Sequence, residues 1–135
     1  EAAGPESVRA AIRTGTKRIG HGVRSTEDES VLEQIRESGI TLEMCPTSNR
    51  QTHAIPDMKQ YPLIPFLESG IQVTVNTDDM GIERTCLSKE FEYLRCEFGL
   101  TKAQEKKLLL NAADAAFAGE KTKNMLREKI GECYD

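Results

Sequence analysis

Short apolar segments that alternate with helix-like segments constrain the fold of this chain more than any other feature. Three of them are expected to be strands, near residues 17–20, 40–45 and 71–77. Apolar residues at helical spacing mark the segments around them, 5–14, 25–38 and 63–68. Strands separated by helices pair in parallel, because each crossover returns the chain to the same end of the sheet. The pattern therefore predicts an α/β fold.

The length of 135 residues limits how much of a parallel architecture the chain contains. A closed (β/α)8 barrel typically takes about 250 residues, and a three-stranded parallel sheet leaves two exposed edges. We therefore expect a partial (β/α)8 TIM barrel, roughly its C-terminal half, as one domain over 1–135 with no separate second domain. Extra C-terminal helices are expected over 87–98, 101–117 and 121–130, and Thr101 with Gln104 forms a capping-box pattern. Because the first residue is Glu1 rather than Met, we expect the chain to begin within a longer protein.

Polar side chains that could act in catalysis or bind a metal follow the first and third predicted strands. The third strand should stop at Asp78, and Asp79 follows directly. Two adjacent carboxylates at a strand's carboxyl end suit a site in a parallel sheet, but they equally suit a cap of the next helix or turn. His21 stands between Gly20 and Gly22, where a general base or metal ligand is favoured over a turn histidine. In a parallel barrel all of these residues share one rim.

Other candidates are better explained as structural residues. His53 lies in a polar segment, so a surface position is expected. The segment 45–49 follows the second strand, where its hydroxyls and amide either bind substrate or, as we favour, build a turn. Cys45 is not expected to be a nucleophile, because no base lies near it in sequence. The four cysteines have no metal-site spacing, and we expect reduced, mostly buried thiols.

Composition excludes several classes of function. The net charge is −4, so there is no electrostatic footprint for nucleic acid. No apolar run approaches the roughly 20 residues of a membrane span. We expect a cytoplasmic protein because the cysteines are expected to be reduced thiols. A histidine and carboxylates on one rim suit a hydrolytic metal site. Catalytic zinc takes about three protein ligands, however, which is more than these residues supply.

Sequence motifs in a fixed order now point to a known family. They read RIGHGVR at 18–24, CPTSN at 45–49 and VNTDD at 75–79. With these motifs and a continuing similarity through LSKEF at 87–91, the chain resembles the C-terminal half of adenosine deaminases, metal-dependent hydrolases with a (β/α)8 barrel. The opening EAAGPESV looks like the continuation of that family's His-Ala-Gly-Glu motif, with Glu1 as its glutamate.

The resemblance implies a reaction and a role for each matching residue. The reaction is zinc-dependent hydrolysis of adenosine or deoxyadenosine to inosine and ammonia, a step of purine salvage. Glu1 matches the acid that protonates N1 of the purine, and His21 matches the residue that orients and deprotonates the water on zinc. Asp78 matches the carboxylate ligand of the single zinc ion. Asp79 matches the aspartate that contacts the purine N7 and the attacking hydroxide.

Three histidine ligands of the family's zinc ion lie outside this chain, so the isolated chain is expected to be inactive. One alternative is a sister enzyme that deaminates adenine or another 6-aminopurine, although Gly20 and Thr47 favour the nucleoside. Another is a catalytically silent half-barrel that self-associates. A receiver-like phosphorylation domain lacks its expected pattern of a strand-borne aspartate and a later lysine. The expected partners are a purine nucleoside and a cover for the open sheet edges, either a second copy or a missing N-terminal half.

Overall fold

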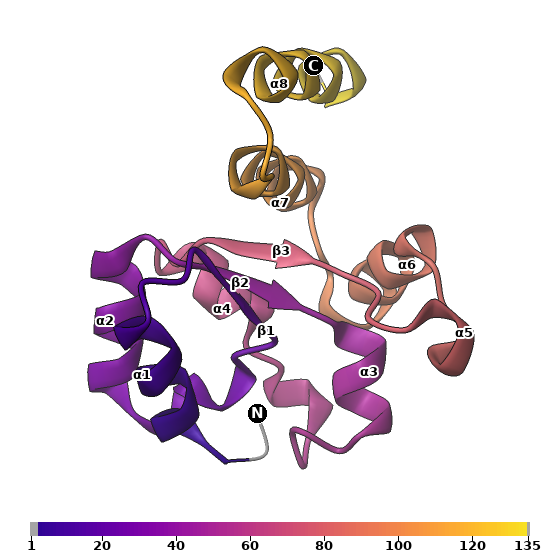
Figure 1. The fold of residues 1–135 in the computed structure, drawn as a ribbon. Coiled ribbons are helices and arrows are strands. Elements are labelled where there is room, and N and C mark those ends of the chain that lie inside the picture. The colour runs from indigo at the N-terminus through magenta and orange to yellow at the C-terminus, as the bar shows by residue number, and fades with distance from the viewer. Residues whose placement is uncertain (1–2, 135) are drawn as a thin grey trace.

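The structure is a computed structural model that describes residues 3–134, and it is an α/β fold. Its parallel sheet has the order β1-β2-β3, formed by Arg18–Gly20, Thr41–Met44 and Val73–Val75. Leu42 lies opposite Ile19 on one side and opposite Val73 on the other. The predicted parallel sheet in chain order is therefore confirmed, and the fold is a partial barrel (Figure 1).

The six predicted helices are present in the expected order, and two short α-helices that were not predicted, α3 and α5, follow β2 and β3. The α-helices are α1 Pro5–Arg13, α2 Glu29–Ser38, α3 Pro46–Gln51, α4 Leu63–Glu68, α5 Met80–Glu83, α6 Leu87–Phe98, α7 Lys102–Ala115 and α8 Glu120–Tyr134. Two 3-10 helices complete the set, η1 Val23–Glu27 and η2 Met58–Gln60. The capping box that opens α7 is present. As Figure 1 shows, α7 lies beside β3, and α8 is stacked on the outer side of α7.

Two predictions about the elements and one about the cysteines were wrong in detail. Pro46 opens α3 instead of breaking the chain into a turn, because proline fits the first position of a helix, where no intrahelical N–H is needed. The third strand ends at Val75 rather than at Asp78. Of the four cysteines, only Cys45 is buried, and the thiols of Cys86, Cys96 and Cys133 are exposed. These three lie on α6 and α8 or at their ends, where the outer helix face meets solvent.

The core forms around the central strand β2. Leu42 and Met44 are fully buried, and they belong to one cluster with Ile35 of α2 and Leu63 of α4. Burial of aliphatic side chains contributes about 25 cal/mol per Å² of apolar surface, so this cluster is the main source of the sheet's stability. Within residues 3–134 no helix is both long and apolar enough to cross a membrane.

The outer edge of β3 is partly covered by a side chain of α7. The carbonyl of Gln72 accepts from the Leu42 N–H, and the Asn76 N–H donates to the Met44 carbonyl. The backbone N–H and C=O groups of the even-numbered residues of this strand therefore point toward β2. Val73 therefore points its backbone groups away from β2, because these directions alternate along a strand. The buried Asn111 amide donates to the Val73 carbonyl at 3.0 Å. One acceptor at this edge is thus satisfied without a neighbouring strand.

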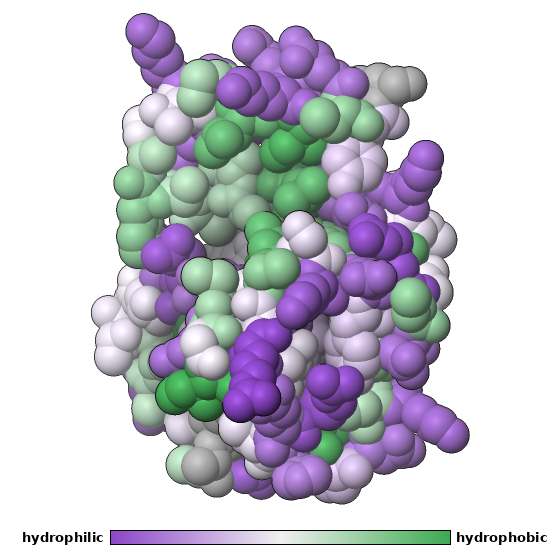
Figure 2. Space-filling model, turned by 90° about the vertical axis from the view of Figure 1, so that its right-hand side faces the viewer, coloured by the Kyte–Doolittle hydropathy of each residue, from purple (hydrophilic) through white to green (hydrophobic). Residues whose placement is uncertain are grey.

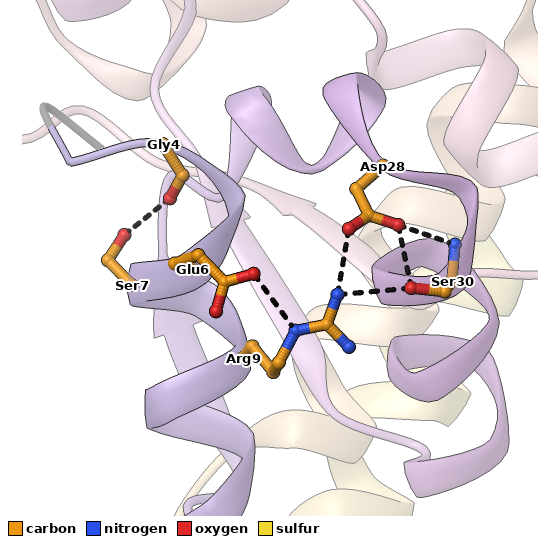
Figure 3. A network of polar contacts seen from close by, with 6 residues as sticks. All are labelled: Gly4, Glu6, Ser7, Arg9, Asp28 and Ser30. Atoms are coloured by element: carbon orange, nitrogen blue, oxygen red, sulfur yellow. Dashed lines mark hydrogen bonds and ion pairs between the residues drawn. The ribbon is translucent and has the colours of Figure 1, made fainter.

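A polar network ties α1 to the start of α2 (Figure 3). Asp28 is the N-cap of α2, and its Oδ1 accepts from the Ser30 N–H at 2.9 Å and from the Ser30 hydroxyl at 2.6 Å. Its other oxygen accepts from Arg9 Nη2 at 2.7 Å. Arg9 also pairs with Glu6 at 3.3 Å within α1. Hydrogen bonds from Ser30, more than the Arg9 charge, lower the pKa of the Asp28 carboxyl.

This pKa gives the Asp28→Ala variant a pH-dependent effect. A carboxyl whose pKa is lowered by folding stabilises the protein above its ordinary pKa of 3.8. That contribution disappears as the pH falls through the lowered value. We expect Asp28→Ala to lower the Tm at neutral pH, and we expect the difference from wild type to shrink at about pH 2. Thermal denaturation at both pH values measures this difference in Tm between Asp28→Ala and wild type.

Glu37→Ala is a matched control, because Glu37 is exposed on the last turn of the same helix. It should not lower the Tm at either pH, since a negative charge at a helix C-terminus is not stabilising. An Asp28→Ala deficit that is unchanged in acid would contradict the assignment to the ionised cap.

Candidate active site

The loop after β1 holds His21 in a left-handed backbone conformation with φ 59°. Its N–H donates to the carbonyl of Glu43 at 2.8 Å, which continues the sheet ladder for one more bond. The next residue, Gly22, has φ 72°, and a Cβ there would lie 2.9 Å from a methyl of Leu42. Only glycine fits this position, so the turn that presents His21 depends on Gly22 and on its close packing over the core.

Asp78 approaches His21 from the loop after β3. Its backbone is also left-handed, with φ 57°. The carboxylate Oδ2 lies 3.5 Å from His21 Nε2 and accepts a hydrogen bond from the Ser48 hydroxyl at 2.8 Å. The predicted meeting of His21 and Asp78 at one end of the sheet is therefore present. The carboxyl ends of β2 and β3 point to the side of the molecule occupied by α3, α5 and α6 (Figure 1).

Asn49 holds the other ring nitrogen of His21. Asn49 Nδ2 lies 3.0 Å from His21 Nδ1, and Asn49 Oδ1 accepts from the Tyr61 hydroxyl at 3.0 Å. Because the tyrosine donates to the amide oxygen, the amide nitrogen faces the ring. In this arrangement Nδ1 accepts from the amide, which leaves Nε2 as the ring nitrogen on the side of Asp78.

An open hollow of about 350 Å³ lies between the strand ends, lined by Gly20, His21, Glu43, Cys45, Asn76, Thr77 and Asp78. Burial, followed by the negative charges of Asp78, Glu90 and Glu43, raises the pKa of the Cys45 thiol to about 12. The thiol is therefore protonated at neutral pH, and a protonated thiol is a poor nucleophile. This agrees with the expectation that Cys45 does not act as a nucleophile.

Asp79 takes the capping position that the sequence left open as an alternative. It is the N-cap of α5, and its Oδ1 accepts from the N–H groups of Gly81 and Ile82, each at 2.9 Å. A contact of Asp79 with substrate stays a prediction. Glu1 lies outside the residues that the structure describes, and its proposed role as an acid also stays a prediction. His53 is exposed, as expected for a surface residue.

The residues around the hollow fit part of a zinc site. Ligand atoms of His21, Cys45 and Asp78 lie within 4.8 Å of one another. An imidazole nitrogen and a carboxylate oxygen are ordinary zinc ligands, but the protonated thiol of Cys45 is not. Zinc in catalytic sites takes about three protein ligands. The donor set is therefore suitable in kind but incomplete in number within the described part of the chain.

We expect the isolated chain to bind zinc weakly or not at all, because His21 and Asp78 alone are too few ligands. Isothermal titration calorimetry with zinc measures the affinity. Asp78→Ala should then titrate like the wild-type chain. Submicromolar binding that is lost in Asp78→Ala would contradict this expectation and show a complete site within the chain.

Two residues of the site were considered but not favoured from the sequence, and two others were not predicted at all. Ser48 and Asn49 lie in a segment expected to build a turn, but α3 directs them to Asp78 and His21. Tyr61 and the buried Glu90 gave no sequence signal, because their partners lie 12 and 43 residues away along the chain. The position of Ser48 and Asn49 directly after a strand's carboxyl end had raised substrate binding as an alternative for segment 45–49, but turn building was favoured.

The fold and the site define a partial (β/α)8 barrel with a histidine–carboxylate centre at the carboxyl ends of its strands, the arrangement of hydrolytic barrel enzymes. The family model of adenosine deaminase matches residues 1–133, and the chain belongs to that family. This confirms the resemblance seen in the sequence.

Curated relatives carry the same family name. The chain is 42% identical over 134 residues to an adenosine deaminase of Haemophilus ducreyi, covering 99% of this chain and 39% of the relative. It is 40% identical over 131 residues to an adenosine deaminase of Escherichia coli, covering 96% of this chain and 39% of the relative. The chain thus spans about two fifths of the length of these relatives.

Solved structures of deaminases share the fold. An adenine deaminase from Arthrobacter aurescens superposes with a TM-score of 0.92 at 26% identity, over 96% of this chain and 40% of that one. An N6-methyl-AMP deaminase from Arabidopsis thaliana gives a TM-score of 0.84 at 26% identity, over 95% and 37%. An amidohydrolase from Burkholderia ambifaria with bound zinc shares the fold at 23% identity, with a TM-score of 0.84 over 98% and 37%.

Proposed function

We propose that this chain supplies the C-terminal part of the active site of a zinc-dependent adenosine deaminase, which hydrolyses adenosine or deoxyadenosine to inosine and ammonia in purine salvage. The observation that carries the proposal is the approach of His21 Nε2 to Asp78 Oδ2 at 3.5 Å, at strand ends of a chain of this family. The names of the relatives from Haemophilus ducreyi and Escherichia coli support adenosine as the substrate.

Each candidate site residue has a defined task in this proposal. Zinc, when bound, supplies a Lewis acid and lowers the pKa of water. Asp78 is one of its ligands, and the hydrogen bond from Ser48 fixes the orientation of that carboxylate. His21, which lines the hollow, orients and deprotonates the zinc-bound water in this proposal, and its Nε2 lies 3.5 Å from Asp78 Oδ2.

Two acidic residues complete the proposed substrate contacts. Asp79 Oδ1 accepts from N–H groups in the first turn of α5. In the proposal, the same carboxylate also contacts the purine N7. Glu1 protonates the purine N1. Both roles follow from the family resemblance. The amide variants Glu1→Gln and Asp79→Asn test them.

A chimera tests the proposal without requiring activity of the isolated chain. In it, this chain replaces the 134 matching residues of the Haemophilus ducreyi enzyme. We expect release of ammonia from adenosine and near-stoichiometric zinc by metal analysis. A folded chimera that holds zinc but releases no ammonia from any 6-aminopurine would refute the proposal.

A second candidate is deamination of adenine or another 6-aminopurine. The adenine deaminase from Arthrobacter aurescens, with its TM-score of 0.92, favours it. Adenosine, deoxyadenosine, adenine and N6-methyl-AMP should be assayed side by side with the same chimera. A kcat/KM that is highest for adenine or N6-methyl-AMP would replace the nucleoside with that substrate.

We also propose that the isolated chain self-associates or pairs with a partner that covers its open face. Figure 2 shows hydrophobic side chains gathered in a hollow on the upper half of one face, the part that contains α7 and α8. Phe117, between α7 and α8, and Ile82 of α5 are 77% and 75% exposed. Among the described residues, β1 and β3 each pair with a single strand. Exposed strand edges and apolar patches favour association.

Sedimentation velocity at low concentration tests this proposal. A stable interface covers more than about 1,000 Å², so we expect a dimer or larger species rather than a free monomer. A monomer with a cooperative melt would contradict it. The zinc content of the associated chain tests the catalytically silent half-barrel. A stable self-associated chain without zinc favours this hypothesis for the isolated polypeptide, and near-stoichiometric zinc argues against it.

A further inference from the structure

Glu90 is a fully buried carboxylate outside the hollow, with 0% exposure, on the first turn of α6. A buried carboxylate is costly unless hydrogen bonds satisfy its oxygens. Here Oε2 accepts from the Thr47 N–H at 2.9 Å, and Oε1 accepts from the Thr85 hydroxyl at 2.5 Å. Each carboxylate oxygen of Glu90 therefore has a hydrogen-bond donor from the protein. These two bonds account for a carboxylate at this buried position without a contact to substrate.

The contact with Thr47 falls on the N-terminus of α3. The N-cap of this helix, Cys45, makes no side-chain capping bond, and Pro46 has no N–H to satisfy. The Thr47 N–H is the next donor without an intrahelical acceptor. Glu90 caps it from a residue 43 positions away, and a carboxylate at this end also complements the helix dipole.

The two residues that follow Thr47 are those that touch the candidate catalytic pair. Ser48 donates to Asp78 at 2.8 Å, and Asn49 lies 3.0 Å from His21 Nδ1. Because one helical turn carries all three contacts, a shift of its first N–H moves both side chains. We propose that Glu90 is a positioning residue, which fixes the start of α3 and thereby the orientation of Asp78 and His21. Its meaning for catalysis rests on the proposed function, but its positioning effect does not.

Three substitutions separate the contributions of shape, charge and hydrogen bonding. Glu90→Leu removes both acceptors at similar volume. Glu90→Gln retains an oxygen for the Thr47 N–H and offers its amide group to the Thr85 hydroxyl, which rotates to accept. Thr85→Val removes only the second contact. Glu92→Leu is the matched control, because Glu92 is exposed on the same helix.

The test is NMR of the full 135-residue chain, which requires no activity. In Glu90→Leu we expect the Thr47 amide to exchange about tenfold faster or more, the effect of one lost hydrogen bond. We expect the side-chain signals of His21 and Asn49 to move with it. Glu90→Gln and Glu92→Leu should keep the wild-type signals, and Thr85→Val should shift them in the same direction by less.

Wild-type His21 and Asn49 signals in a folded Glu90→Leu chain would overturn the proposal, and so would equal shifts in Glu92→Leu. If Glu90→Leu does not fold, Thr85→Val decides, because loss of one hydroxyl leaves the carboxylate and its volume in place. Unmoved signals in Thr85→Val then overturn the proposal. An inactive chimera refutes the deaminase function alone, since these signals are measured without substrate.

Discussion

We expect His21→Asn to lower the kcat/KM of the chimeric enzyme for adenosine by about 10²–10⁴-fold, the usual contribution of a general acid–base residue. Asparagine tolerates the left-handed backbone of this position, φ 59°, so the turn should persist. What disappears is the ring nitrogen that faces Asp78 at 3.5 Å. Steady-state kinetics, with zinc content measured in the same preparation, gives the result.

The chain offers an internal control for this substitution. His53 is the second histidine, and its backbone is also left-handed, with φ 53°. It is exposed in the segment between α3 and η2, so His53→Asn should leave kcat/KM within about twofold of wild type, as for other surface substitutions. A loss below tenfold in His21→Asn with full zinc occupancy would show that His21 does not move the proton.

We expect Leu42→Ala to lower the free energy of unfolding of the chain by about 2–5 kcal/mol, the range for a buried leucine in a well-packed core. Leu42 is 0% exposed in the central strand. The cavity would open next to Gly22, where a Cβ would lie only 2.9 Å from a Leu42 methyl, so the turn that carries His21 should also loosen. Urea denaturation at fixed protein concentration measures the difference, because any association shifts apparent stability.

Leu87→Ala is the comparison that separates burial from residue type. Leu87 begins α6 and is 44% exposed, so its truncation should cost well under the Leu42 value, about 1 kcal/mol or less. Equal losses at the two positions would mean that β2 is not the centre of the core. An unchanged midpoint for Leu42→Ala would contradict the packing described for the Gly22 turn.

The sequence by itself was sufficient for the arrangement of the strands and for one half of the site. Alternation of apolar strands with helices predicted the parallel order of the sheet, because local periodicity and short crossovers leave few other topologies. His21 between two glycines and Asp78 after a β-branched run marked the strand ends, and parallel strands bring such ends together. The capping box at Thr101 is a local hydrogen-bond pattern, and it too was read correctly.

Only the tertiary structure decided how the candidate pair is held. Asp79 had two local explanations, and the structure shows that it caps the start of α5, whereas its contact with substrate stays a prediction. The exposure of three cysteines depended on which helix faces met solvent. Glu90 reaches Thr47 across 43 residues, and the Tyr61 hydroxyl donates to Asn49, which contacts the imidazole. Such contacts leave no periodic signal, because they are set by where whole helices pack and not by the neighbours of each residue in the chain.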